Sequence, residues 1–257
     1  MSAQLTSVRS ERVTFVRRLH DRSVRRERGL FVVEGAQGVR EALARNGVIQ
    51  QLYVSESIAD RWHDVQVQVT VTTDQVLAAM GETEHPQGVL AVCRTVDVAL
   101  AELPRDLRTV LVLHQANDPG NAGTMLRSAD AFGADAVIFT KGSVDVYNGK
   151  CVRATAGSIF HLPIVNGVEL SDVAALLHAA GIRLRATDGN ATTTLESIDL
   201  TVPTAWLIGT EAHGLDAAAL ELADDRVSIP MAGEAESVNA AVAASIVLYR
   251  SQVARSA

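Results

Sequence analysis

A polar segment in the second half of the chain could bind an anion. NDPGNAGTMLRSADAFGAD (residues 117–135) places Asn121 and Arg127 six residues apart, and residues 121, 124 and 127 share one face of a helix. Pro119 and the glycines suit a helix start, where free backbone N–H groups can meet an anion. We place Arg127 in the first turns of this helix, where it opposes the helix dipole at a cost of up to about 1 kcal/mol. A capped amphipathic helix explains Asn121 and Pro119 but not Arg127, which indicates an anionic partner such as an RNA phosphate.

A second segment, IGTEAHGL (residues 208–215), joins a buried strand to a helix through Gly209 and Gly214. Glycines at such a junction allow the backbone to approach a ligand closely. Glu211 between them is either a favourable charge at the start of a helix or a group that positions a substrate.

The third segment, VSIPMAGEAESVNAAVAASIVLYR (residues 227–250), passes from a short β-branched run through Pro230 into a loop and then an alanine-rich helix. Ser237 and Asn239 precede this helix and could simply cap it. The alternative interpretation is a ligand-binding loop that folds against the helix.

The elements around these segments alternate between strands and helices. The predicted strands are TVLVLH (109–114), DAVIF (135–139), HLPIV (161–165), RLRAT (183–187) and TAWLIG (204–209). This alternation predicts a mostly parallel sheet with helices on both faces. Ligands of such sheets bind at the carboxyl ends of the strands, where all three segments are expected to lie.

The first part of the chain predicts a smaller α/β domain. A leading helix is expected over residues 5–28, followed by a strand at LFVVEG (30–35), a helix through about Arg45, and strands at QLYVSE, VQVQVTV and GVLAVCR (88–94). The expected division is an N-terminal domain over 1–97, a linker over 98–107 and a second domain over 108–257.

Composition limits the class of protein but leaves its partner open. The net charge is −7, yet residues 1–30 hold eight arginines against three acidic residues. Arginine suits phosphate groups and base stacking, although a solvated helix face is an equally simple explanation. The two cysteines have no CxxC spacing, and no signal peptide or membrane span is predicted, which favours the cytoplasm and no metal site. Fingerprints for a dinucleotide fold, a phosphate loop, a zinc protease or a serine hydrolase are missing.

The three segments together resemble the SpoU (TrmH-type) branch of the SPOUT RNA methyltransferases. NAGTMLR (121–127) is similar to the family's first motif, LIGTEAHGL (207–215) to its second, and SIPMAGEAESVNAAVAASIVLYR (228–250) to its third. FVVEGAQGVREAL (31–43) resembles the start of the L30e-like substrate-binding domain that many members carry, and VRATAGSIFHLPI (152–164) resembles a segment between the motifs. The resemblance covers nearly the whole chain.

The resemblance implies a C-terminal SPOUT α/β domain with a deep trefoil knot, a small N-terminal L30e-like α/β domain, and a homodimer. It also implies S-adenosylmethionine as the cofactor and a ribose 2′-hydroxyl of structured RNA as the methyl acceptor. Ribosomal RNA is favoured over tRNA because two-domain members of this kind more often resemble ribosomal RNA enzymes.

The resemblance assigns roles position by position. Arg127 is the expected catalytic arginine, and the other catalytic positions are Asn121, Glu211, Ser237 and Asn239. The expected cofactor-binding residues are Leu207, Gly209, Ile229, Met231 and Val238. The expected RNA-binding residues are Arg17, Arg18, Arg22, Arg25, Arg26 and Arg153. Two positions depart from the family pattern: Val238, where leucine is usual, and His114, where aspartate is frequent.

Three alternatives remain open at this point. The chain could be a tRNA 2′-O-methyltransferase, a catalytically inactive RNA-binding protein of the same fold, or a small-molecule α/β enzyme whose arginine recognises a carboxylate. The intact set of motif residues counts against an inactive protein, and the N-terminal arginines count against a small-molecule enzyme.

Overall fold

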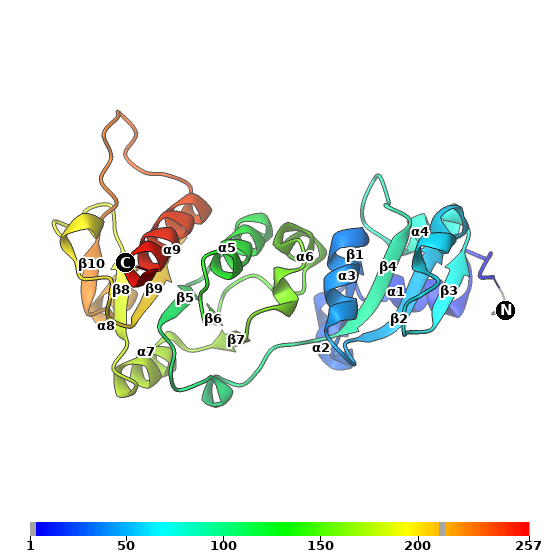
Figure 1. Cartoon of the computed structure of the whole chain (residues 1–257), viewed down its shortest axis with the longest axis horizontal. Helices are drawn as coiled ribbons and strands as arrows, with labels where there is room; N and C mark the ends of the chain where they lie inside the picture. The colour runs from blue at the N-terminus through cyan, green and yellow to red at the C-terminus, as the bar shows by residue number, and fades with distance from the viewer. Residues whose placement is uncertain (1–3, 211–213, 257) are drawn as a thin grey trace. The chain divides into compact units, whose positions relative to one another are not determined.

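The structure is a computed structural model that describes residues 4–210 and 214–256. Contacts divide the chain into two compact units (Figure 1). The first comprises Met1–Val96 and Tyr147–Phe160, and the second comprises Asp97–Val146 and His161–Ala257. Residues 147–160, which we expected to belong to the second domain, therefore make most of their contacts within the first unit.

The first unit is built on a four-stranded sheet of order β1-β4-β2-β3, in which only the β2–β3 pair is parallel. Its strands are β1 (Leu30–Glu34), β2 (Ile49–Ser55), β3 (Val69–Thr72) and β4 (Val89–Arg94). Its helices are α1 (Glu11–Arg18), α2 (Arg22–Arg28), α3 (Ala36–Ala44), η1 (Glu56–Trp62), α4 (Asp74–Met80), α6 (Gly149–Thr155) and η3 (Ser158–Phe160).

The prediction of a single helix over residues 5–28 is wrong, because two helices occupy this region. Leu19 ends α1, and Asp21 caps α2 by accepting a hydrogen bond from the Ser23 backbone N–H at 2.7 Å. An aspartate at an N-cap competes with helix continuation, so it starts a new helix in a new direction. Helix α6 was not predicted from the sequence.

Both faces of the small sheet are covered. Val13 and Val16 of α1, and Leu19 at its C-terminal cap, pack with residues of β2, β4 and α4 in one core. Phe31 of β1 meets the rings of Tyr147 and Phe160, at centroid distances of 4.6 and 6.1 Å. Residues 147–160 are thereby bound to β1 by aromatic packing.

The second unit contains a six-stranded sheet in which every pair is parallel, with the order β10-β8-β9-β5-β6-β7. Its strands are β5 (Thr109–Leu113), β6 (Ala136–Thr140), β7 (Ile164–Val168), β8 (Arg183–Thr187), β9 (Thr204–Ile208) and β10 (Asp225–Val227). Its helices are η2 (Leu100–Glu102), α5 (Pro119–Ala131), α7 (Leu170–Ala179), η4 (Leu195–Ser197), α8 (Ala217–Leu222) and α9 (Ala240–Ser256).

Helices cover both faces of this sheet, as alternation along the strands requires. Val110 and Val112 of β5 share one core with Val173 and Leu177 of α7 and with Ala219 of α8. On the opposite face, α5 and α9 pack together and against the central strands (Figure 1). The indole N–H of Trp206 in β9 donates to Ser251 Oγ of α9 at 2.8 Å, which fixes α9 on the sheet.

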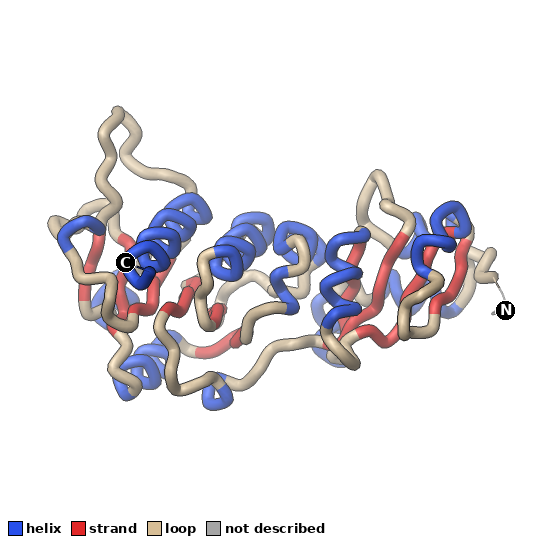
Figure 2. Tube along the Cα trace, viewed as in Figure 1, coloured by secondary structure: helices blue, strands red, loops and turns tan. Residues whose placement is uncertain are grey.

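Strand order also determines where a ligand can bind. The chain leaves β5 toward β6 and β7 on one side, whereas β9, β8 and β10 lie on the other side. The loops after β5 and β9 therefore diverge at a topological switch point, where open parallel sheets bind ligands. A long loop, drawn in tan in Figure 2, connects β10 to α9. No helix of the described residues is long and apolar enough to cross a membrane.

Candidate functional site

Helix α5 presents Arg127 to solvent. Asp118 caps the helix by accepting a hydrogen bond from the Asn121 backbone N–H at 2.8 Å, and Pro119 occupies the first position. Arg127 is the ninth of the 13 residues of α5, so the expectation that it lies in the first turns is wrong and the dipole argument does not apply to it. Its side chain is exposed and forms no hydrogen bond or ion pair with the described residues. The guanidinium is therefore available to an external anion.

Asn239 connects the third motif to the first. Its side-chain Nδ2 lies 3.3 Å from Asn121 Oδ1, and its Oδ1 accepts a hydrogen bond from the Ala241 backbone N–H at 2.8 Å. It therefore begins α9 and contacts α5 at the same time. Both asparagines line a groove of about 350 Å³ between α5 and α9, together with Thr124 and Tyr249.

A larger cavity, of about 680 Å³, lies among the loops that follow β8, β9 and β10. The predicted cofactor residues Gly209, Ile229, Met231 and Val238 line it, and so does Ser237. Leu207 does not line it, because its side chain is fully buried in the core on the α7 face of the sheet. Ala240 and Ala243 at the start of α9 also face the cavity, and their small side chains leave room in it.

The cavity wall after β9 includes Gly209, Thr210 and Gly214, whose backbones lie close together. Thr210 and Gly214 exchange two backbone hydrogen bonds, each of 3.0 Å. A Cβ atom at Gly209 would overlap the Gly214 carbonyl and lie 2.7 Å from the Leu215 nitrogen. Position 209 therefore requires glycine, because the backbone of Gly214 and Leu215 leaves no room for a side chain. Glu211, predicted to be catalytic, lies outside the described residues.

The cavity wall is acidic. Asp188, Glu234 and Glu236 line it, whereas no lysine, arginine or histidine is among its lining residues in the described part of the chain. Such a wall favours a positively charged ligand. Asp188 and its neighbours Thr187 and Gly189 were missed from the sequence, although they follow the predicted strand 183–187 and the rule for carboxyl ends of parallel strands applied to them.

The predicted RNA-binding arginines separate into two groups. Arg17, Arg18, Arg22 and Arg26 are exposed on α1 and α2. Arg25 is only 4% exposed, and its Nη1 donates to the carbonyls of Leu19 at 2.9 Å and His20 at 2.7 Å. The guanidinium donates to carbonyls at the end of α1 from within the fold, which makes Arg25 a weak candidate for an RNA contact.

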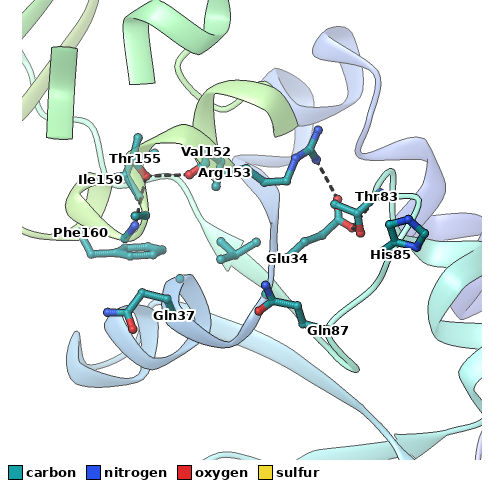
Figure 3. Close-up of a pocket in the computed structure, with 15 residues that line it drawn as sticks. Glu34, Gln37, Thr83, His85, Gln87, Val152, Arg153, Thr155, Ile159 and Phe160 are labelled. Carbon is teal, nitrogen blue, oxygen red and sulfur yellow. Dashed lines mark hydrogen bonds and ion pairs between the residues drawn. The ribbon is translucent and has the colours of Figure 1, made fainter. Parts of the chain in front are cut away.

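Arg153 also forms its ion pairs within the first unit. Its Nη1 donates to Glu34 Oε1 at 3.0 Å (Figure 3). The same nitrogen lies 3.5 Å from Glu82 Oε2. Glu34 in turn accepts hydrogen bonds from the backbone and hydroxyl of Thr83. Glu34, Thr83 and Arg153 of this network line a cavity of about 220 Å³. Gln37, Gln87 and Phe160 also line it (Figure 3). The charge of Arg153 is thus balanced by two carboxylates, which leaves it a weak candidate for a phosphate contact.

Comparisons with known proteins agree with this arrangement. The SpoU rRNA Methylase family matches residues 108–249, and an MRM3-like substrate binding domain matches residues 10–91. The 23S rRNA (guanosine(2553)-2'-O)-methyltransferase RlmP of Bacillus subtilis is 35% identical, over 96% of this chain and 98% of its own length. The 23S rRNA (uridine(2479)-2'-O)-methyltransferase of Streptomyces viridochromogenes is 36% identical, over 90% of this chain and 85% of its own.

Solved structures show the same similarity. The SpoU methyltransferase AviRb from Streptomyces viridochromogenes, in complex with AdoMet, superposes with a TM-score of 0.88 and 31% identity. The match covers 97% of this chain and 99% of that one. An AdoMet-bound rRNA methyltransferase from Sinorhizobium meliloti gives a TM-score of 0.87 at 29% identity, over 98% of this chain and 97% of that one.

Proposed function

This chain belongs to the SpoU rRNA methylase family, and we propose that it uses S-adenosylmethionine to methylate a ribose 2′-hydroxyl in ribosomal RNA. It is an RNA 2′-O-methyltransferase. The observation that carries the proposal is the 680 Å³ cavity at the carboxyl edge of the parallel sheet, because residues of the second and third motifs line it together. The two relatives named above modify riboses of 23S rRNA, which favours ribosomal RNA over tRNA.

The cavity fits the cofactor in size and charge. S-adenosylmethionine carries a sulfonium and an ammonium against one carboxylate, so its net charge is positive, and the cavity wall holds Asp188, Glu234 and Glu236. Gly209, Ile229 and Val238 would hold the adenosyl moiety through their backbone groups. When bound, the cofactor supplies an electrophilic methyl group to the ribose oxygen.

Arg127 is proposed as the catalytic residue that faces the ribose hydroxyl or its neighbouring phosphate. A guanidinium remains protonated in proteins, so it is poorly suited to act as a base. It can instead stabilise the negative charge that develops on the 2′-oxygen, which is a large contribution when the group is positioned in advance. Asn121, Ser237 and Asn239 are proposed to orient the hydroxyl, together with Glu211.

The substrate RNA is proposed to contact the first unit through Arg17, Arg18, Arg22 and Arg26. These exposed side chains lie on two successive helices, and arginine recognises phosphate through two parallel hydrogen bonds. An enzyme with a ribosomal substrate is expected to work in the cytoplasm.

A homodimer is proposed to form through α9. Val242, Tyr249 and Val253 are 47%, 51% and 39% exposed, and their spacing of seven and four residues puts them on one face of the helix. Exposed apolar side chains arranged in this way are typical of an interface. We further propose that α9 completes a deep trefoil knot. The return of the chain from the edge strand β10 to the central strands β5 and β9 is consistent with that path.

The test is methyl transfer from labelled S-adenosylmethionine to ribosomal RNA, followed by mapping of the modified ribose. Arg127→Ala should reduce turnover by about a thousandfold, in the range lost when one transition-state donor is removed. Its affinity for S-adenosylmethionine, measured by calorimetry, should stay within twofold. Arg105→Ala removes another exposed arginine of the same unit and serves as the matched control, with full activity.

Near-normal turnover by Arg127→Ala would remove Arg127 from the proposed mechanism. Cofactor binding without transfer to any RNA would instead indicate an inactive RNA-binding homologue. Transfer to tRNA in preference to ribosomal RNA would correct the substrate class while leaving the chemistry in place.

A further inference from the structure

A cavity of about 220 Å³ in the first unit takes no part in the proposed methyl transfer. All of its lining residues belong to that unit, and Figure 3 shows Phe160 and Gln37 at one end of it and His85 at the other. Pockets for drug-sized ligands measure about 300–1,000 Å³, so this cavity has the size for a single ring system and is too small for a whole S-adenosylmethionine.

The floor of the cavity is apolar. Val33 of β1 and Val152 of α6 line it, and so do Ile159 and Phe160 of η3; each of these side chains is at most 5% exposed. The Phe160 ring is held in place by Phe31, whose ring centroid lies 6.1 Å away. Apolar and aromatic walls of this kind bind a flat ring system by burying its surface.

The carboxylate and the guanidinium that line the cavity bind each other. Glu34 accepts hydrogen bonds from the backbone N–H groups of Glu82 and Thr83 and from the Thr83 hydroxyl. It also accepts one from Arg153 at 3.0 Å. A carboxylate has about four positions for hydrogen-bond donors, so these bonds occupy Glu34 fully. The charges of Glu34 and Arg153 therefore balance, which favours an uncharged ligand.

Two exposed glutamine side chains at the cavity offer one donor and one acceptor. Gln87 Oε1 accepts a hydrogen bond from the Ala36 backbone N–H at 2.9 Å, which leaves the Gln87 Nε2 group to donate. Gln37 Nε2 donates to Glu41 Oε1 at 2.6 Å, which leaves Gln37 Oε1 to accept. A backbone N–H only donates and a carboxylate only accepts, so both amide orientations are fixed. Gln87 Nε2 and Gln37 Oε1 form no other hydrogen bond with the residues that the structure describes.

We propose that this cavity binds one unstacked nucleobase of the substrate RNA, a role that rests on the proposed function. A nucleobase is an uncharged flat ring whose edge carries both donors and acceptors. Proteins that read RNA bind such bases where single-stranded loops splay them out, by contact with the ring and by hydrogen bonds to its edge. Gln87 donates to this edge and Gln37 accepts from it. Both glutamines lie within the residues that match an MRM3-like substrate binding domain, which favours RNA over a free nucleoside as the source of the base.

A substitution that keeps the shape of Gln87 tests the donor. Gln87→Glu retains an oxygen for the Ala36 N–H and replaces the free N–H group by a second oxygen. Gln68→Glu is the matched control, because it adds the same charge at an exposed position of the same unit that does not line the cavity. Fluorescence anisotropy with ribosomal RNA should give a dissociation constant about tenfold higher for Gln87→Glu than for Gln68→Glu. The two variants should show the same dependence on salt concentration, since the lost contact is to a base and not to a phosphate.

Gln37→Met gives an independent measurement, because it removes the acceptor without adding a charge. It should also weaken binding of ribosomal RNA about tenfold, with an unchanged melting temperature, since Gln37 is exposed. Single-stranded RNA oligomers of one base each, and an abasic oligomer with the same phosphates, are the probes for the base itself. At least one of the four should bind the wild type about tenfold more tightly than the abasic oligomer does, and Gln87→Glu should lose this preference.

Equal affinity of Gln87→Glu and Gln68→Glu for ribosomal RNA would overturn the proposal, and so would wild-type affinity of Gln37→Met. A loss that is accompanied by a smaller salt dependence than that of Gln68→Glu would assign the contact to a phosphate and would also overturn it. Binding of free nucleosides that Gln87→Glu abolishes, with RNA affinity unchanged, would identify a small-molecule site instead. Failure of the wild-type protein to bind ribosomal RNA would contradict the proposed function itself.

Discussion

Single residues of the candidate site are constrained by how closely the backbone approaches itself. Gly209 is the clearest case, since the atoms that a side chain would meet there belong to the backbone of Gly214 and Leu215. Backbone cannot move aside as a flexible side chain can, so the space is closed to every residue except glycine.

We expect Gly209→Ala to break the two backbone hydrogen bonds between Thr210 and Gly214. Overpacking of this kind costs about 2 kcal/mol of the free energy of unfolding. It should also abolish measurable binding of S-adenosylmethionine, because Gly209, Thr210 and Gly214 line the cavity. The measurements are a thermal melt and calorimetry.

Gly233→Ala is the control for stability, since a Cβ atom there meets no atom within 4 Å. Its melting temperature should equal that of the wild type. If Gly209→Ala binds the cofactor with wild-type affinity, then close backbone approach at this position is not needed for the site.

At the scale of elements, neighbouring arginines of α2 have opposite roles. Arg25 is buried and bonds two carbonyls at the end of α1, whereas Arg26 is exposed. Sequence position alone does not distinguish them, because the direction of α2 relative to α1 decides which side chain points inward.

Arg25→Met should lower the free energy of unfolding by about 2 kcal/mol, since the carbonyls of Leu19 and His20 lose their donor. The matched variant Arg26→Met should leave the melting temperature unchanged and weaken binding to ribosomal RNA fragments, with a smaller dependence of affinity on salt concentration. The opposite pattern, a stable Arg25→Met with reduced RNA affinity, would return Arg25 to the RNA-binding set.

The edge strand β10 is attached by charge as well as by backbone pairing. Asp225 bonds Arg183 at two distances of 3.0 Å and Arg185 at 3.2 Å, and the Arg185 side chain is only 4% exposed. Partial burial acts to raise the pKa of Asp225, but the hydrogen bonds and positive charges of the two arginines outweigh burial and lower it. The folded state therefore favours the carboxylate.

A lowered pKa in the folded state means that the stabilisation is present above the unfolded pKa of about 4 and is lost as the pH falls below it. Asp225→Asn should cost about 3 kcal/mol at pH 7, because a buried guanidinium loses its partner. The difference in melting temperature from the wild type should shrink as the pH falls from 4 toward 2. A difference that stays constant over this range would show that ionisation of Asp225 does not stabilise β10.

At the scale of the whole molecule, the proposed dimer accounts for the exposed apolar face of α9. Tyr249→Glu places a charge on this face and should convert a dimer to a monomer, because an unpaired carboxylate at an apolar interface costs several kcal/mol. Light scattering coupled to size exclusion measures the mass directly.

Arg250→Glu is the neighbouring control, since Arg250 is exposed on the same helix and lies outside the apolar stripe. It should remain dimeric. A wild-type protein that is monomeric at micromolar concentration would remove this interface from the proposal.

The sequence by itself determined most of the strands and the class of chemistry. Strands such as 109–113 and 204–208 are short, largely apolar runs whose local pattern identifies them, and the motif segments around Arg127, Gly209 and Asn239 are contiguous. Local periodicity and contiguous motifs do not depend on the path of the chain, so they can be recognised before the fold is known.

Only the tertiary structure decided which side chains meet. Asp188 lies beside the motif loops in the cavity, Arg153 is paired with Glu34, and His114 faces Asp216 across about a hundred residues of chain. Burial and charge pairing depend on strand order and on the direction in which each helix leaves its cap. Those are properties of the whole chain path, and no short segment contains them.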